Sequence, residues 1–268
     1  MTTARLAPRT ALFLPASNPR AIEKAGTLAV DLVILDLEDA VRDEAKAEAR
    51  AAAVEAAARG FGPRLCAIRI NGSDSGEHLA DLASVARSLA DFVVLPKAES
   101  AEDAADVYKA CGKPLLAMIE TPLGVLAAAE IGAVDGVSGL IAGTNDLAAG
   151  LRLPPGSGRA GMSVALQTIV LAARANAIWA IDGVFNGLAD PDGLAGECRE
   201  GRTLGFDGKS LIHPGQIDIA AAAFGAAPEE LEDARALIDA AQGGAERFRG
   251  RMIEAMHVSQ AKALLDRM

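Results

Sequence analysis

Eight short apolar runs alternate with Ala-rich, charged stretches along this chain of 268 residues, and this alternation constrains its fold more than any other feature. Successive runs start roughly 20 to 40 residues apart, which is the spacing of repeated strand–helix units. A chain of this length also matches the usual size of a (β/α)8 barrel. We therefore expect an α/β protein that forms a (β/α)8 TIM barrel. The runs are Ala11–Leu14, Leu32–Leu35, Leu65–Ile70, Phe92–Leu95, Leu115–Ile119, Gly139–Ala142, Ile178–Ile181 and Gly208–Ile212.

Helix signals fill the gaps between these runs. Asp43–Arg59 is rich in Ala, Glu, Lys and Arg and is followed by a glycine, a common helix end. Ser100 and Ser163 are predicted N-caps of two helices, and the helix after Ser163 is expected to run through Ala175. Pro228 is predicted to start a further, amphipathic helix. The turn after the first run lacks the G-x-G-x-x-G pattern of an open dinucleotide-binding sheet, which favours the closed barrel.

The barrel pattern ends near residue 242, so we expect two regions. Residues 1–242 form the barrel, and the Gly243-Gly244 pair breaks the helix that precedes it. Residues 243–268 form a C-terminal helical extension that packs on, or is swapped into, a neighbouring subunit. The loop Leu151–Gly161 is compatible both with a mobile lid and with an ordinary connection.

Composition narrows the class of partner. The net charge is -10 and the sequence pI is about 4.9, which argues against nucleic acid and anionic membrane surfaces. The chain shows no signal-peptide core or membrane-spanning run, and its three cysteines are scattered without a C-x-x-C pair. We expect a cytoplasmic protein with reduced, structural cysteines that acts on small molecules.

Polar side chains follow nearly every predicted strand. Asp36, Glu38 and Asp39 come directly after the buried-looking second run, where three carboxylates are costly to desolvate unless a cation or donors meet them. In a (β/α)8 barrel the active site lies at this end of the strands. The other strand-end groups are Ser17, Arg20, Arg69, Asn71, Lys97, Glu120, Thr121, Thr144, Asn145, Asp146, Asp182 and His213.

Glu120 and Asp146 follow neighbouring strands and are the candidate metal ligands. Two carboxylates with open positions suit Mg2+ or Mn2+, and the lack of a His pair at ligand spacing argues against zinc. Taken singly, each acid has an even chance of being a helix N-cap. The pairing on adjacent strands favours the metal site.

Three basic side chains have competing interpretations. Arg69 could clamp a substrate carboxylate or steady an enolate, or form a structural salt bridge to Glu38 or Asp39. Lys97 could form a Schiff base, but an ion pair with the barrel acids is favoured. His213 could contact substrate or be purely structural.

Seven motifs, in chain order, resemble the citrate lyase beta-subunit-like family of the HpcH/HpaI aldolase/citrate lyase superfamily, which includes malyl-CoA and citramalyl-CoA lyases. The ordered set is specific although each piece is weak. The matching pieces are Leu12-Phe-Leu-Pro15, Asp36-Leu-Glu-Asp39, Arg69-Ile-Asn-Gly72, Leu95-Pro-Lys-Ala-Glu-Ser100, Ile119-Glu-Thr-Pro122, Gly143-Thr-Asn-Asp-Leu147 and Gly205-Phe-Asp-Gly-Lys-Ser-Leu-Ile-His-Pro214.

The resemblance implies Mg2+, a CoA thioester substrate, and cleavage or formation of a carbon–carbon bond that yields a 2-oxo acid and an acyl thioester. It assigns the metal to Glu120 and Asp146, which with Arg69 and His213 would contact substrate. The CoA moiety would lie near Phe13, Arg20 and Lys24 of the first-strand region.

The resemblance also gives the tail a role. In many relatives a G-x-M-I/V-D segment donates a catalytic aspartate to a neighbouring subunit, commonly in a trimer. Here the segment reads Gly250-Arg-Met-Ile-Glu254, so a glutamate replaces the aspartate. The expected assembly is a homotrimer or another homo-oligomer. The base that takes the hydroxyl proton would be Glu254 of a neighbour, Asp36 or Glu38.

Two other functions stay open from the sequence. The first is a class II aldolase that acts on 4-hydroxy-2-oxo acids and releases pyruvate without CoA. The second is a citrate-lyase-type beta subunit that acts only within a complex, or a non-catalytic barrel that binds a thioester.

Overall fold

The computed structural model describes residues 6–265, which divide into two compact units. Ala7–Phe224 forms one unit, and Gly225 onward, with Leu6, belongs to the other. No helix among residues 6–265 is both long enough and apolar enough to cross a membrane.

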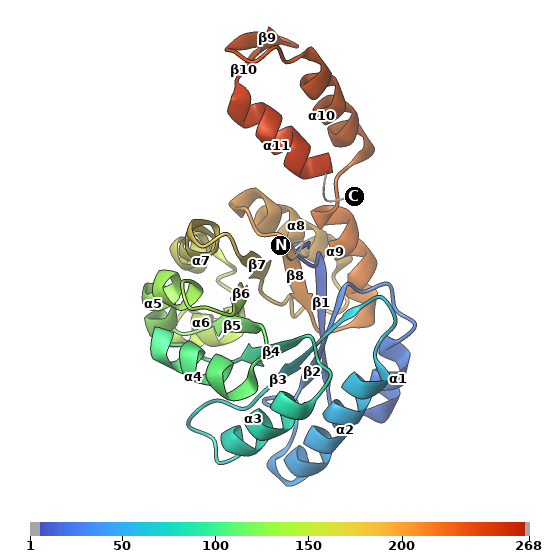
Figure 1. Ribbon diagram of the computed structural model, residues 1–268, viewed down its shortest axis with the longest axis vertical. Helices are drawn as coiled ribbons and strands as arrows, with labels where there is room; N and C mark the ends of the chain where they lie inside the picture. The colour runs from blue at the N-terminus through green and yellow to red at the C-terminus, as the bar shows by residue number, and fades with distance from the viewer. Residues whose placement is uncertain (1–5, 266–268) are drawn as a thin grey trace. The chain divides into compact units, whose positions relative to one another are not determined.

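The first unit is a closed barrel of eight parallel strands that pair in chain order, with β8 returning to β1 (Figure 1). This confirms the predicted (β/α)8 fold, and every expected run overlaps a strand. The strands are β1 Thr10–Pro15, β2 Leu32–Asp36, β3 Leu65–Arg69, β4 Phe92–Leu95, β5 Leu115–Ile119, β6 Val137–Ala142, β7 Trp179–Asp182 and β8 Gly208–Leu211.

Helices connect the strands and surround the barrel (Figure 1). The α-helices of this unit are α1 Pro19–Ala25, α2 Lys46–Arg59, α3 His78–Arg87, α4 Ala101–Cys111, α5 Pro122–Gly132, α6 Thr144–Gly150, α7 Ser163–Ala175, α8 Pro191–Leu204 and α9 Ile217–Phe224. Short 3-10 turns occur at η1 Asp43–Ala45, η2 Ala160–Met162 and η3 Pro214–Gln216.

Alternation along each strand separates two apolar cores. On β2, Ile34 belongs to the cluster inside the barrel, whereas Val33 and Leu35 belong to the larger cluster between the strands and the helices. Since side chains alternate between the two faces of a strand, Asp36 continues the inward-facing row. The same alternation decides which polar side chain at a strand end reaches the barrel mouth.

One of the two predicted serine caps is confirmed. Ser100 is the N-cap of α4, and its hydroxyl oxygen accepts a hydrogen bond from the Asp103 N–H at 3.1 Å. The prediction for Ser163 is wrong. The turn η2 already leads into α7, so Met162 is the N-cap and the Ser163 hydroxyl donates to the Ala160 carbonyl at 2.9 Å.

The second unit contains α10 Pro228–Ala240, the antiparallel strands β9 Glu246–Phe248 and β10 Arg251–Ile253, and α11 Ala255–Leu265. Ala234 and Leu237 of α10 share a small core with Ile253 and Ala261. The compact units therefore divide after Phe224, earlier than the boundary expected at residue 242, because α10 packs on α11. The Gly243-Gly244 break lies within this unit, between α10 and the hairpin.

Candidate active site

A cavity of about 380 Å³ lies at the carboxyl ends of the barrel strands, where the sequence places the site. Five of the predicted site residues line it: Phe13, Asp36, Arg69, Glu120 and Asp146. The remaining lining residues are Leu14, Pro15, Asp39, Ala40, Met118, Ala142, Gly143, Thr144, Asn145, Val184, Ser210 and Ile212.

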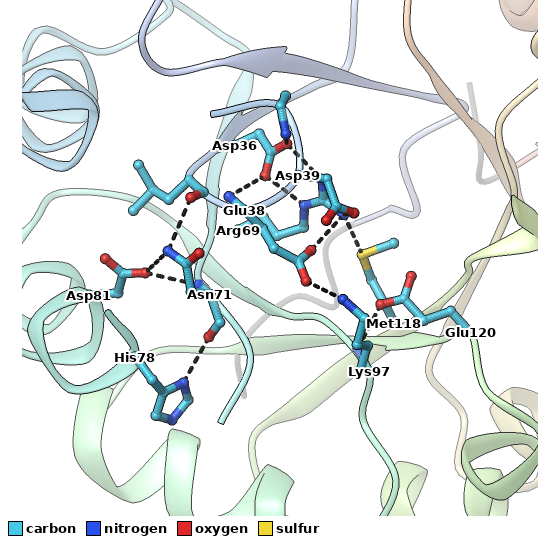
Figure 2. Close-up of polar contacts among 12 residues, drawn as sticks. Asp36, Glu38, Asp39, Arg69, Asn71, His78, Asp81, Lys97, Met118 and Glu120 are labelled. Carbon is cyan, nitrogen blue, oxygen red and sulfur yellow. Dashed lines mark hydrogen bonds and ion pairs between the residues drawn. The ribbon is translucent and has the colours of Figure 1, made fainter. Parts of the chain in front are cut away.

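Arg69 and Asp36 form a bidentate ion pair across the paired strands β2 and β3 (Figure 2). Arg69 Nε donates to Asp36 Oδ1 at 2.7 Å and Nη2 donates to Oδ2 at 2.6 Å. The backbone N–H groups of Glu38 and Ala40 donate to the same two oxygens at 2.9 and 3.1 Å. Both oxygens of Asp36 are thus occupied, and its carboxylate fixes the orientation of the guanidinium.

Apolar and acidic groups enclose the rest of the Arg69 guanidinium. The Phe13 ring centroid lies 5.0 Å from Arg69 Cζ, a cation–π distance. Nη1 lies 3.8 Å from Met118 Sδ and 3.0 Å from Glu38 Oε2. Although burial lowers the Arg69 pKa, the hydrogen bonds and charge of Asp36 raise it further, so the side chain stays cationic.

Glu38 bridges Arg69 and Lys97 (Figure 2). Lys97 Nζ donates to Glu38 Oε1 at 2.6 Å, whereas Oε2 has no hydrogen bond among the described residues. Desolvation raises the Glu38 pKa, whereas the positive charges of Arg69 and Lys97 lower it; the net shift is upward. The preferred interpretation of Lys97, an ion pair with the barrel acids, is confirmed. The structural salt bridge considered for Arg69 is also present, to Asp36 and Glu38 together.

A buried polar layer holds the segment that carries Glu38, and the sequence interpretation missed it. Lys46 Nζ donates to the carbonyls of Leu37 and Glu38 at 3.0 and 3.1 Å and to Asn71 Oδ1 at 2.7 Å. Asp81 is fully buried and accepts from the Asn71 side chain at 2.6 Å. Lys46 begins a helix whose sequence reads as charged and exposed, so only the fold shows that it points inward.

Glu120 is 2% exposed and follows β5, which pairs with β6. Its Oε1 accepts a hydrogen bond from the Lys97 N–H at 2.7 Å. Burial is the main cause that raises the Glu120 pKa to about 7. The hydrogen bond from Lys97 lowers this pKa, and the negative charge of Glu38 raises it. A Cβ at Gly143 would lie 2.3 Å from Glu120 Oε2, so the glycine leaves the space that the carboxylate fills.

Asp146 lies in the first turn of α6, is exposed, and has no hydrogen bond or ion pair with a described residue. The capping alternative is wrong for both acids. Thr121 caps α5 by accepting from the Gly124 N–H at 3.0 Å, and Gly143 is the N-cap residue of α6. Both carboxylates are therefore left facing one cavity.

Several predicted site residues lie elsewhere. His213 is exposed and caps η3, with Nδ1 accepting from the Gly215 N–H at 3.1 Å. Arg20 and Lys24 are exposed on α1 outside the cavity lining. Glu254 follows β10 in the other compact unit.

Asp182 is the strand-end acid whose position differs most from the expectation. Asp182 is fully buried and its carboxylate lies against Gly201 of α8. A Cβ added at Gly201 would be only 2.5 Å from Asp182 Oδ2. It pairs with Arg159 and Lys209, two basic residues that the sequence interpretation did not single out. No sequence signal marked them, since one lies in a loop and the other inside a strand.

The cavity has the chemistry of a divalent-cation site beside a fixed positive charge. Glu120 and Asp146 supply two carboxylate oxygen donors to the cavity. Residues 6–265 contain no group of three or more His, Cys, Asp or Glu side chains that could hold a metal, so the protein would supply two ligands and not a complete set. A cation held by two carboxylates keeps positions for water and substrate oxygens. The Arg69 guanidinium can stabilise a developing oxyanion in the same cavity.

Comparisons with known proteins agree with this geometry. The family model of the HpcH/HpaI aldolase/citrate lyase family matches residues 9–214, and that of the C–C bond lyases of the TIM-barrel fold matches residues 162–268. A (3S)-malyl-CoA thioesterase from Cereibacter sphaeroides is 41% identical over 268 residues, covering 96% of this chain and 93% of the relative. A citrate lyase subunit beta-like protein from Mycobacterium tuberculosis is 35% identical over 263 residues, covering 96% and 94%.

A solved structure extends the likeness to three dimensions. It is that of the protein CitE from Mycobacterium tuberculosis in complex with magnesium, acetoacetate and coenzyme A. It superposes with a TM-score of 0.86 at 34% identity and covers 97% of this chain and 98% of that chain. The barrel, the ordered motifs and the family-model match lead to one conclusion: the chain is an enzyme of the HpcH/HpaI aldolase/citrate lyase family, of the citrate lyase beta type.

Proposed function

We propose that this protein is a Mg2+-dependent carbon–carbon lyase that acts on a hydroxyacyl-CoA thioester of the malyl, citramalyl or citryl class. The products would be a 2-oxo acid and an acyl thioester. The observation that supports this most directly is the meeting of Glu120, Asp146 and Arg69 in one cavity. The relatives support the substrate class, since one is named for malyl-CoA and a CitE structure holds magnesium, acetoacetate and coenzyme A.

Glu120 and Asp146 would hold the Mg2+ ion. The donor set fits, because Glu120 has one oxygen without a hydrogen bond to a described residue and Asp146 has two. When bound, the ion would polarise the oxygens of the 2-hydroxy acid end of the substrate. Metal binding also requires Glu120 to lose its proton, which its pKa of about 7 allows near neutral pH.

Arg69 would stabilise the thioester enolate that forms when the carbon–carbon bond breaks. Its side chain is 10% exposed and lines the cavity, where a preorganised donor is worth more than in water. Asp36 is a positioning residue, since both of its oxygens are already occupied. It is therefore a weaker candidate for the base than the sequence alone suggested.

The base that takes the hydroxyl proton would be Glu38 or Glu254. Burial raises the Glu38 pKa, and its Oε2 has no hydrogen bond among the described residues, so it can accept a proton. Glu254 would act from a neighbouring subunit of a homotrimer or another homo-oligomer, as the resemblance implies. A glutamate in place of the aspartate shifts the carboxylate by roughly an ångström, and a displacement of that size can cost on the order of 100-fold in rate.

Two inactive variants test the neighbouring-subunit role directly. Asp146→Ala and Glu254→Gln would each abolish turnover alone. Mixed after partial denaturation and refolding, they would regain activity if one chain supplies the metal ligand and another supplies Glu254. Turnover by Glu254→Gln alone would assign the base to Glu38 instead. Mixtures that stay inactive, while a mixture with wild-type chains is active, would exclude complementation between subunits.

The CoA part of the substrate would lie along the first strand and helix. Arg20 and Lys24 are exposed and one helical turn apart on α1, so both can reach a phosphate group on the same side. Phe13, in the preceding strand β1, lines the cavity. We further expect the enzyme to work in the cytoplasm, in keeping with its three free, buried cysteines.

The decisive assay follows two products of malyl-CoA at the same time. Formation of a 2-oxo acid without free thiol identifies a lyase. The observation of a 41% identical (3S)-malyl-CoA thioesterase favours thioester hydrolysis as a second candidate, which would release free CoA thiol without a 2-oxo acid. Activity only on pyruvate and an aldehyde would identify the aldolase, and no activity without a carrier-protein thioester would identify a complex-dependent subunit.

A further inference from the structure

A second set of buried charged side chains lies on the outer face of the barrel wall. We call Arg159, Asp182, Glu197 and Lys209 the outer cluster. Asp182 and Lys209 are 0% exposed, and Arg159 is 9% exposed. None of the four is among the described residues that line the cavity. Lysine is almost never fully buried unless it is paired, so this arrangement needs an explanation that the proposed chemistry does not provide.

The four charges of the outer cluster sum to zero and are paired with one another. Arg159 Nε, which has no hydrogen bond among the described residues, lies 3.9 Å from Glu200 Oε2. Arg159 forms a bidentate pair with Asp182, with distances of 2.7 and 3.0 Å from Nη2 and Nη1 to Oδ1 and Oδ2. Lys209 Nζ donates to Asp182 Oδ2 at 3.1 Å and to Glu197 Oε1 at 2.7 Å. Two positive and two negative groups therefore offset one another's desolvation.

The outer cluster also holds the chain that follows β7. The Gly183 N–H donates to Asp182 Oδ1 at 2.8 Å, and the Gly183 carbonyl accepts from Lys209 Nζ at 2.6 Å. The Ser210 hydroxyl, which lines the cavity, donates to the Asp182 carbonyl at 2.8 Å. The start of the segment 183–186 is thus fixed on both its N–H and its carbonyl side.

That segment supports the first turn of α6. A Cβ at Gly183 would lie 2.4 Å from Thr144 Cγ2, so the Gly183 backbone lies close against the Thr144 side chain. The Thr144 hydroxyl donates to the Val184 carbonyl at 3.4 Å, and Asn186 Nδ2 donates to Asn145 Oδ1 at 2.7 Å. Asp146 is the next residue along the same turn.

Arg159 connects the outer cluster to the other end of α6. The helix ends at Gly150, and the loop that follows it runs directly to Arg159. Because Asp182 anchors Arg159 and also the segment beneath Thr144, one carboxylate restrains α6 from both sides. Its short length of seven residues gives this helix little stability of its own.

We propose that the outer cluster is a positioning device that sets the place of the Asp146 carboxylate. Lys209 and Arg159 are its positioning residues, acting through Asp182 and the segment 183–186. This inference rests on the proposed role of Asp146 as a metal ligand. It predicts that charges with no access to the cavity control metal affinity.

The test compares Lys209→Met and Arg159→Met with the control Arg174→Met. Arg174 of α7 also pairs with a buried acid, Asp207, at 2.9 Å, but it is half-exposed and has no contact with the segment 183–186 among the described residues. Calorimetric titration measures Mg2+ binding, and hydrogen exchange of the metal-free protein measures the mobility of α6. Both are carried out well below the unfolding temperature of each variant.

The two outer-cluster variants are expected to bind Mg2+ about 10- to 100-fold more weakly, as for other residues that orient a metal ligand. Backbone hydrogen exchange of the metal-free protein should become faster within residues 144–161. The kcat at saturating Mg2+ should stay within a few-fold of the wild-type value. The control should change neither quantity. A Lys209→Met protein with wild-type affinity and exchange, or with an increase spread evenly over the barrel, would overturn the inference.

A second variant covers the case in which Lys209→Met does not fold. Gly183→Ala keeps every charge but pushes against Thr144, so it should weaken Mg2+ binding in the same way. Unchanged affinity in Gly183→Ala would count against the inference. If the wild-type protein takes up no Mg2+, the proposed function fails, and the exchange experiment alone decides whether the outer cluster positions α6.

Discussion

The barrel carries two clusters of charged side chains, and they differ in the face of the barrel wall on which they lie. We call Asp36, Glu38, Arg69 and Lys97 the inner cluster. Asp36 and Arg69 line the cavity, and Glu38 Oε2 has no hydrogen bond to a described residue. Asp182 and Lys209 of the outer cluster are sealed between strands and helices. A charged residue at a strand end therefore indicates chemistry only when its side chain faces the barrel interior.

The inner cluster has more hydrogen-bonding groups available to a ligand than the outer cluster, in which Arg159 Nε is buried without a hydrogen bond among the described residues. Arg69 keeps N–H groups beyond the two that bind Asp36, and Lys97 is 40% exposed. In the outer cluster both oxygens of Asp182 are shared between partners. Inner-cluster substitutions should therefore lower kcat, whereas outer-cluster substitutions should lower metal affinity and stability.

The largest effect is expected at the open side of the cavity. Asp146→Ala removes a proposed metal ligand that is exposed and has no hydrogen bond or ion pair with a described residue, so the fold should be unaffected. Metal-dependent turnover should fall on the order of 1000-fold, the scale of Lewis-acid stabilisation. Steady-state kinetics with a Mg2+ titration measure this, and Glu130→Ala, an exposed acid of α5, is the control. Wild-type turnover by Asp146→Ala in the presence of chelator would refute the assignment.

A somewhat smaller effect is expected within the inner cluster. Arg69→Lys keeps the positive charge but loses the bidentate pair with Asp36. We expect kcat to fall about 100- to 1000-fold, as when one oxyanion donor is removed. Arg174→Lys, the same change in a pair outside the site, should keep its kcat. Equal losses in the two variants would mean that Arg69 is only structural.

The pH dependence of metal binding is the third test. Since burial raises the Glu120 pKa to about 7, protons compete with Mg2+ below that pH. Affinity should fall up to about tenfold per pH unit on the acidic side. In the metal-free protein the pKa is higher in the folded than in the unfolded state, so this group's contribution to stability is present at low pH and is lost as the pH rises through about 7. Calorimetry and thermal melts across this range check both signs, and a flat affinity profile would contradict them.

The smallest change is expected at Lys97. Burial lowers its pKa, but the hydrogen bond to Glu38 raises it further, so the amine stays protonated and is a poor nucleophile. Lys97→Met should lower kcat only about tenfold by leaving Glu38 without one partner, and Lys97→Arg should recover part of the loss. Borohydride added with pyruvate should trap no adduct on Lys97. A trapped adduct, detected by mass spectrometry, would replace the metal mechanism with an imine mechanism.

Most of the barrel was predictable because each strand is short, apolar and bounded by turn residues. The run at Leu115–Ile119 matches β5 at both ends, and the run at Phe92–Leu95 matches β4. The helix opened by Ser163 was predicted with the wrong cap, because a 3-10 turn precedes it. Such errors occur where local hydrogen bonds, and not hydrophobic periodicity, decide the boundary.

The cavity residues were predictable one by one, but their partners were not. Spacing placed Glu120, Asp146 and Arg69 at strand ends on neighbouring parts of the barrel, and the structure brings all three to one cavity. The sequence did not mark Lys46 or Lys209 as buried, since a lysine in a charged helix or close to an acid in the sequence is usually exposed. Their burial depends on carboxylates and carbonyls that lie far away in the sequence.

The order of hydrophobic runs and polar strand ends determined the barrel, the end that carries the site and the family, because these follow from local periodicity and from motifs that are read along the chain. Only the tertiary structure decided that Arg69 and two backbone N–H groups occupy both oxygens of Asp36, that Asp182 turns outward, and that α10 belongs with the C-terminal unit. The physical reason is that pairing and burial depend on which residues meet across strands and helices. That meeting is a property of the closed barrel and not of any segment alone.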